Sequence, residues 1–128
     1  MGLVEGRFDG ITGAVIGAAI DVHRALGPGL LESGYQRCLA YELSLRGVAF
    51  VRERPIPILY KGEQVPCGYR ADLIVADCVI VEVKAVDKLA PIHHAQMMTY
   101  LRLTGLSTGL LINFNVATLT TGIRRVFR

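Results

Sequence analysis

The sequence predicts an α/β (α+β) fold in which helices pack on a β-sheet, with the element order ααββββαββ. Two helical patterns open the chain, four strand patterns follow, and a third helix precedes two final strands. The 128 residues suffice for one compact domain and are too few for two. No repeat, linker or low-complexity tract interrupts them, so we expect a single domain spanning residues 1–128.

Three segments carry apolar residues at helical spacing, and each ends at a glycine. The breaker Gly27-Pro28-Gly29 closes the first, and Gly47 and Gly105 close the other two. The predicted helices are Phe8 to Leu26, Glu32 to Arg46, and Ile92 to Leu103.

Six short runs rich in β-branched and aromatic residues predict strands. Pro55 and Pro57 favour a sheet edge, and Lys61-Gly62-Glu63 predicts a turn. Because Thr108 to Phe114 is almost continuously apolar, we expect it inside the sheet. The predicted strands are Val48 to Glu53, Ile56 to Tyr60, Tyr69 to Val75, Val79 to Val83, Thr108 to Phe114, and Leu119 to Val126.

Composition excludes several classes of protein. With 52% hydrophobic and 20% charged residues, the chain can bury a full core, which argues against disorder. The apolar stretch Ile11 to Ile20 is too short to span a membrane. The three cysteines lack a CxxC motif, which predicts reduced thiols and a cytoplasmic location. A net charge of +3 is compatible with a nucleic-acid partner but does not indicate one.

Three charged residues interrupt two otherwise apolar strands: Asp72, Glu82 and Lys84. If the hairpin between these strands turns about Asp77, Asp72 lies opposite Glu82, and Lys84 shares their face because side chains alternate along a strand. Two opposed carboxylates with Cβ atoms about 5 Å apart repel each other strongly without a cation between them.

Two interpretations of this cluster remain open from spacing alone. In the first, the carboxylates and the backbone carbonyl of Val83 bind Mg²⁺, which prefers oxygen ligands and keeps several waters. Lys84 would then hold a metal-bound water that attacks a substrate phosphate, or offset the negative charge that develops on this phosphate. In the second, Lys84 forms ion pairs with both acids on a half-exposed sheet face.

Several motifs coincide with this cluster. The runs Tyr69-Arg70-Ala71-Asp72 and Val81-Glu82-Val83-Lys84 resemble the D…ExK core of the PD-(D/E)xK nuclease superfamily. Gln96-x-x-x-Tyr100 is similar to the QxxxY motif of its exonuclease-like branch, and Gly29-x-x-Glu32-x-x-Tyr35 matches the motif of the GxxExxY proteins. The likeness extends from Ile11 to Arg125 and includes Leu111 to Phe114. It departs at Ala71, where the pattern has proline.

The resemblance implies a restriction-endonuclease-like core with a central mixed sheet, and a metal-dependent phosphodiesterase acting on DNA or RNA. It makes Asp72 and Glu82 ligands of Mg²⁺, with Mn²⁺ as a possible substitute, and it brings Glu32 toward the metal. It assigns Lys84 to the nucleophile, and Gln96 and Tyr100 to the active site. A structural alternative for this last pair is a core tyrosine and a polar bridge to the loop after Lys84. Glu32 also suits the positive end of a helix dipole.

A second function is compatible with the same fold. The chain has little beyond a minimal catalytic core, so substrate selection would require homo-oligomerisation or a partner protein. We therefore also consider a non-catalytic module that binds nucleic acid or a protein. No membrane association is expected.

Overall fold

The computed structural model describes the backbone of residues 2–128 and the side chains from residue 10 onward. Its helices are α1 (Gly2–Leu26), α2 (Glu32–Leu45) and α3 (Pro91–Thr104), with a short 3₁₀ helix η1 (Leu119–Gly122). Its strands are β1 (Phe50–Pro55), β2 (Ile58–Tyr60), β3 (Glu63–Val65), β4 (Arg70–Val75), β5 (Val79–Lys84), β6 (Thr108–Asn113) and β7 (Ile123–Phe127).

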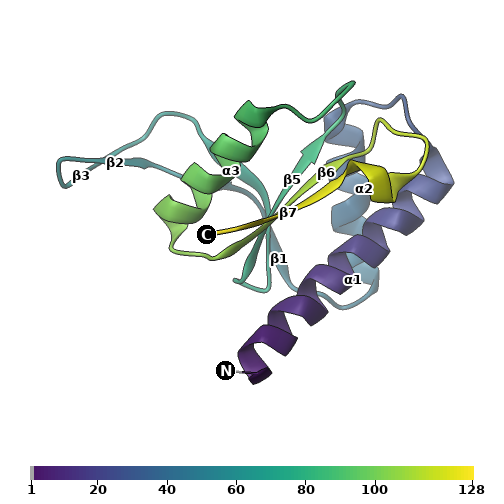
Figure 1. Cartoon of the computed structure of the whole chain (residues 1–128), viewed down its shortest axis with the longest axis horizontal. Coiled ribbons are helices and arrows are strands. Elements are labelled where there is room, and N and C mark those ends of the chain that lie inside the picture. Colours follow the sequence, from purple (N-terminus) through teal and green to yellow (C-terminus); the bar gives the residue numbers. More distant parts are fainter. Residues whose placement is uncertain (1) are drawn as a thin grey trace.

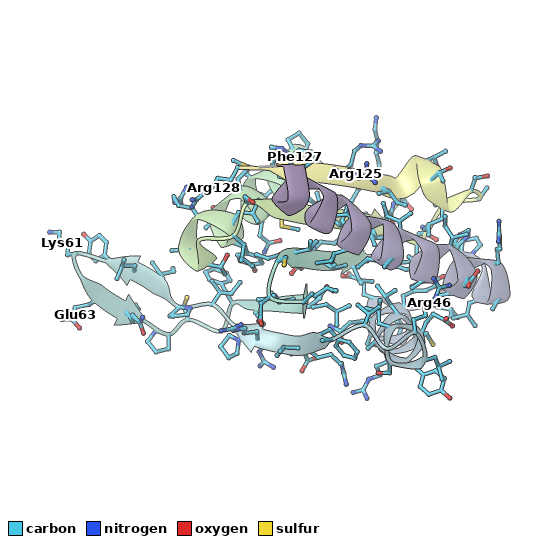
Figure 2. The ribbon with its side chains drawn as sticks, turned by 90° about the horizontal axis from the view of Figure 1, so that it is seen from below. Arg46, Lys61, Glu63, Arg125, Phe127 and Arg128 are labelled. Atoms are coloured by element: carbon cyan, nitrogen blue, oxygen red, sulfur yellow. The ribbon has the colours of Figure 1, made fainter. Side chains whose placement is uncertain are left out.

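Five of the strands form one mixed sheet in the order β1-β4-β5-β6-β7. Strands β5 and β6 run parallel, because the chain crosses over through α3 between them, and the other neighbours are antiparallel. Strands β2 and β3 form a separate hairpin. This hairpin projects from the body of the molecule in Figure 1, and Figure 2 shows Lys61 and Glu63 at its tip.

The sheet is covered on both faces. The helices α1 and α2 cover one face, and α3 covers the other (Figure 1). Alternation divides the strands between the two cores: Val79 and Val81 pack with α1 and α2, whereas Ile80 packs with α3. The core on the α1 and α2 side includes Val15, Leu39, Leu43, Leu73, Val81, Ile112 and Phe114. The core on the α3 side includes Ile74, Ile80, Met97, Tyr100, Leu101 and Leu111.

The register predicted for the central hairpin is confirmed. Val75 pairs with Val79, and Leu73 pairs with Val81. The turn between them has positive φ at Ala76 (51°) and Asp77 (54°), and the Cys78 N–H donates to the Val75 carbonyl. This is the twist that suits a tight hairpin, and it fixes which residues of β4 face those of β5.

The predicted order ααββββαββ lacks one strand, and the last predicted strand begins too early. Strand β3 was not predicted because its three residues are all exposed and leave no apolar alternation. Residues Leu119–Gly122 form η1 instead of a strand. There Thr121 bonds back to the Thr118 carbonyl, and a Cβ on Gly122 would lie 2.3 Å from the Asn113 carbonyl oxygen. Tertiary packing of this kind leaves no periodic signal.

Other predicted features are confirmed. Gly47 and Gly105, with φ of 71° and 77°, follow α2 and α3. Strand β1, which ends at Pro55, lies at the edge of the sheet, and β6 is buried along its whole length. None of the described helices is long and apolar enough to cross a membrane.

Candidate active site

Asp72 lies where the pairing of β4 with both neighbouring strands is interrupted. The β1–β4 register pairs Arg52 with Leu73 and Arg54 with Ala71, but it omits Glu53 and Asp72 between them. Glu53 has a positive φ of 53°, a conformation that regular strand residues do not adopt, and the pairing resumes at Arg54. On the other side, the β4–β5 register ends at the Leu73–Val81 pair.

Carboxylates replace the missing ladder bonds. The Asp72 N–H donates to Glu82 Oε1 over 3.0 Å, and the Val83 N–H donates to Asp72 Oδ2 over 2.8 Å. Each acid therefore bonds to the strand that carries the other. This reciprocal bonding holds the two carboxyl groups side by side, although Asp72 and Glu82 do not form the directly opposed ladder pair that was predicted.

Glu82 is an acid in an unfavourable environment for its charge. Its side chain is only 5% exposed. Burial, and secondly the neighbouring Asp72 carboxylate, raise its pKa, the Asp72 N–H and Lys84 lower it, and the net value is about 8. A cation placed between the two carboxylates would relieve both unfavourable effects.

Lys84 ends β5 and is half-buried. Within the part of the chain whose side chains are described, it forms no ion pair with either acid. Its charge nevertheless acts on Glu82 by lowering the pKa of that carboxyl group. The sheet-face ion pairs of the alternative interpretation are therefore not formed, and the ammonium group is free to serve a ligand.

Asn113 fixes the loop that follows Lys84. Its side chain donates to the Val86 carbonyl over 2.9 Å and accepts from the Val86 N–H over 3.1 Å. The Phe114 N–H also donates to the Lys84 carbonyl. Asn113 belongs to the matched run Leu111 to Phe114, but its part in holding this loop was not predicted.

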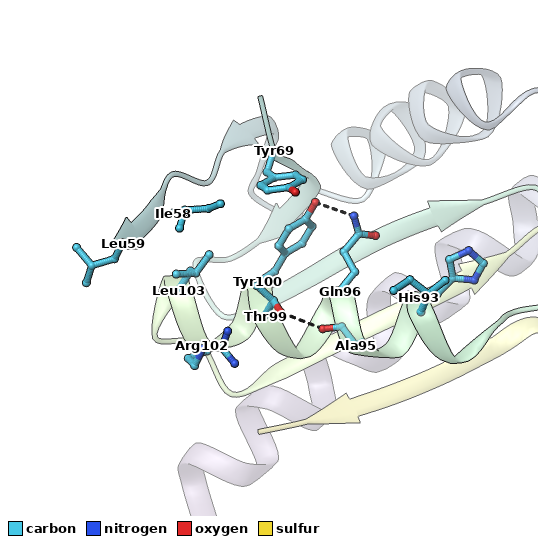
Figure 3. Close-up of a pocket in the computed structure, with 11 residues that line it drawn as sticks. Ile58, Leu59, Tyr69, His93, Ala95, Gln96, Thr99, Tyr100, Arg102 and Leu103 are labelled. Atoms are coloured by element: carbon cyan, nitrogen blue, oxygen red, sulfur yellow. Dashed lines mark hydrogen bonds between the residues drawn. The ribbon is translucent and has the colours of Figure 1, made fainter. Parts of the chain in front are cut away.

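Gln96 and Tyr100 come together on α3. Gln96 Nε2 donates to the Tyr100 hydroxyl over 3.1 Å, as Figure 3 shows. Burial, together with the negative charges of Glu82 and Asp72, raises the pKa of Tyr100 to about 12. The phenol therefore lies within the field of both acids and stays protonated at neutral pH, able to donate a hydrogen bond.

Gln36 also belongs to the candidate site, which the sequence did not predict. It is 8% exposed, and its Nε2 donates to Asp72 Oδ1 over 3.2 Å. Arg52 Nη2 in turn donates to Gln36 Oε1 over 3.3 Å, which fixes the orientation of the amide. Helical spacing contained a usable signal, because Gln36 shares the buried face of α2 with Leu39 and Leu43.

Glu32 begins α2 and is exposed. It lies one turn before Gln36 on the same face of the helix. The other motif residues shape the preceding loop: Gly29 has a φ of 104°, and the Tyr35 hydroxyl bonds to the Gly27 carbonyl and the Leu30 N–H. Tyr35 also stacks on Phe114, with 4.6 Å between ring centroids.

The donor set suits a hard divalent cation. Among the described residues, no three His, Cys, Asp or Glu side chains gather into a metal site. The two adjacent carboxylates nevertheless provide oxygen ligands, and Asp72 is only half-buried, which leaves access from solvent. Magnesium ions in proteins are often held by one or two carboxylates, together with water and substrate oxygens. The residues present therefore fit Mg²⁺.

Comparison with known families agrees with this geometry. A family model described as the PD-(D/E)XK nuclease superfamily matches residues 9–126. The chain belongs to the PD-(D/E)XK nuclease superfamily. Searches of curated proteins and of solved structures find no significant match.

Membership of this superfamily identifies the fold and relates the cluster of Asp72, Glu82 and Lys84 to metal-dependent nucleases. The five-stranded mixed sheet with helices on both faces is a restriction-endonuclease-like core. Nucleases of this superfamily generally use divalent metals and act on nucleic acids. The match does not distinguish the GxxExxY proteins within it, so that narrower assignment remains a prediction.

Proposed function

We propose that residues 1–128 act as one nuclease domain that hydrolyses phosphodiester bonds in DNA or RNA with Mg²⁺, and that this domain is a GxxExxY protein. The observation that carries the proposal is the pair Asp72 and Glu82, held together by reciprocal bonds within the field of Lys84, whose ammonium group forms an ion pair with neither acid. Superfamily membership over residues 9–126 supports the reaction class.

Asp72, Glu82 and the Val83 carbonyl would hold the metal, and Glu32 would approach it from the first turn of α2. When bound, the cation supplies positive charge that stabilises the scissile phosphate and lowers the pKa of the attacking water. Mn²⁺ would substitute for Mg²⁺ because it accepts the same oxygen ligands.

The other residues act on the substrate. Lys84 would hold the attacking water or offset the negative charge that develops on the phosphate. The protonated Tyr100 would donate to a phosphate oxygen, and Gln96 would orient its hydroxyl. We also propose a cytoplasmic location, which the free thiols of Cys38, Cys67 and Cys78 support.

Calorimetric titration with Mg²⁺ or Mn²⁺ tests the metal site. We expect the intact protein to bind at millimolar concentrations or below, and Asp72→Asn and Glu82→Gln to lose this binding. Asp77→Asn is a matched control, because Asp77 is an exposed acid in the same hairpin. Absence of binding by the intact protein would contradict the proposal.

A cleavage assay distinguishes the role of Lys84 in the reaction from the role of the two acids in metal binding. With Mg²⁺ and a panel of single- and double-stranded DNA and RNA, Lys84→Ala should retain metal binding and lose about 100-fold or more in rate. Lys88→Ala, an exposed lysine in the following loop, should behave like the intact protein. Nucleic-acid binding without cleavage of any substrate would favour the non-catalytic alternative.

A further inference from the structure

A groove runs along the outer side of α3 beside the β2–β3 hairpin. Its volume is about 540 Å³, which falls in the range of small-molecule binding sites. Figure 3 shows Tyr69 above Tyr100, with Ile58 and Leu59 contributed by the hairpin. The lining is mainly apolar, with an amide, a hydroxyl and a guanidinium among its polar groups: Ile58, Leu59, Tyr69, Ile92, His93, Ala95, Gln96, Thr99, Tyr100, Arg102 and Leu103.

Tyr100 belongs both to the groove and to the candidate active site. This residue lines the groove, and its hydroxyl lies in the field of Glu82 and Asp72. Gln96 also lines the groove and bonds to the same hydroxyl. A substrate whose phosphate reaches the two acids would therefore place its neighbouring groups in the groove.

Tyr69 presents an aromatic ring to a ligand in the groove. It is 45% exposed although it is large and largely apolar. Its ring centroid lies 6.3 Å from that of Tyr100, and the two rings are tilted by 55°, so they do not stack on each other. Ile92, which also lines the groove, is 69% exposed. Exposed apolar side chains that gather along one groove are typical of a binding surface.

We propose that this groove binds an unpaired nucleobase of the substrate strand, next to the phosphate that is cleaved. A base has flat apolar faces that stack on aromatic and aliphatic side chains, and polar edges that Gln96 and Thr99 can meet. Arg102, exposed on the groove wall, suits the negative charge of a flanking phosphate. The inference rests on the proposed function and narrows its substrate to single-stranded or locally unpaired nucleic acid.

Binding without metal tests the groove separately from catalysis. In EDTA, the anisotropy of a labelled single-stranded oligothymidylate is compared with that of an abasic strand of equal length and charge. We expect the intact protein to bind the strand with bases about tenfold more tightly or better, because bases stack on an aromatic side chain and an abasic strand has none to offer. Tyr69→Ala should bind both strands equally.

Tyr41→Ala is the matched control, since Tyr41 is an exposed tyrosine on α2, which covers the face of the sheet opposite to α3. It should keep the preference for bases. Ile92→Ser alters a second exposed residue of the groove and should also weaken the preference. A loss seen in both variants would not be due to a folding defect of Tyr69→Ala alone. Equal affinities of Tyr69→Ala and the intact protein for oligothymidylate would overturn the inference. So would a sedimentation experiment in which Tyr69→Ala dissociates a dimer, because the groove would then hold a second copy.

The two proposals fail in different ways. If calorimetry detects no metal binding while the preference for bases depends on Tyr69, base binding in the groove is supported and the catalytic proposal is contradicted. If metal-dependent cleavage is found and Tyr69→Ala binds and cleaves like the intact protein, only the groove falls.

Discussion

The acid Asp72 is held by two different elements, and its position depends on both. One oxygen accepts from the Val83 N–H in β5, and the other accepts from Gln36 in α2. The Gln36 amide is itself oriented by Arg52 in β1. A carboxylate without such partners rotates among several conformers, and a metal site built on it loses affinity.

Gln36→Ala should therefore weaken Mn²⁺ binding by about tenfold or more, although Gln36 is not itself a ligand. The loss should appear in calorimetry as a higher Kd with little change in stoichiometry. Gln64→Ala, which removes an exposed glutamine from β3, should leave the affinity unchanged. If both variants bind Mn²⁺ like the intact protein, Gln36 has a purely structural role.

At the scale of elements, the tight β4–β5 hairpin sets the geometry of the site. Its two turn residues both have positive φ, yet neither is glycine. A left-handed conformation costs an ordinary L-residue roughly 1 kcal/mol, which glycine avoids. The exposed Arg54–Asp77 contact at 4.0 Å contributes little to oppose this.

Asp77→Gly should accordingly raise the free energy of unfolding by about 1 kcal/mol. Urea denaturation followed by circular dichroism measures the change. The control is Asp87→Gly, another exposed aspartate, whose φ is not positive. That change adds freedom to the unfolded chain and should not stabilise the protein. A decrease in stability for Asp77→Gly would contradict the turn geometry.

The same elements show what sequence could and could not predict. The period of two along β4 and β5 and the short loop between them sufficed to set the register, because any slip would move buried valines to the other face. Strand β3 and η1 were missed, since an exposed hairpin and a helix shaped by packing against Asn113 carry no periodic pattern. Gln36 was not predicted, because the sequence shows that it lies on a buried helical face but not that it bonds to Asp72, 36 residues further on.

At the scale of the whole molecule, the sheet and its two helical layers enclose the site and control its charge. Gln36 from α2 bonds to Asp72, and Tyr100 from α3 lies in the field of Glu82. Glu82 interrupts the apolar strand β5 and is shielded from water, with only 5% of its surface exposed. This shielding strengthens every interaction of the carboxylate with a bound cation. It also makes the metal-free protein sensitive to pH.

The sign of that sensitivity follows from the raised pKa. Unfolded, Glu82 titrates near its ordinary value of about 4.3, whereas in the metal-free fold burial and Asp72 raise its pKa to about 8. Between these two values the folded protein binds more protons than the unfolded chain, so the contribution of Glu82 to stability falls as pH rises from about 4.3 to about 8.

Glu82→Gln mimics the neutral acid and removes this dependence. In EDTA, urea denaturation should show the intact protein losing a few kcal/mol relative to Glu82→Gln between pH 5 and pH 8.5. Millimolar Mg²⁺ at pH 8.5 should restore part of that loss in the intact protein alone. Parallel pH profiles of the two proteins in EDTA would show that Glu82 is already ionised in the metal-free fold.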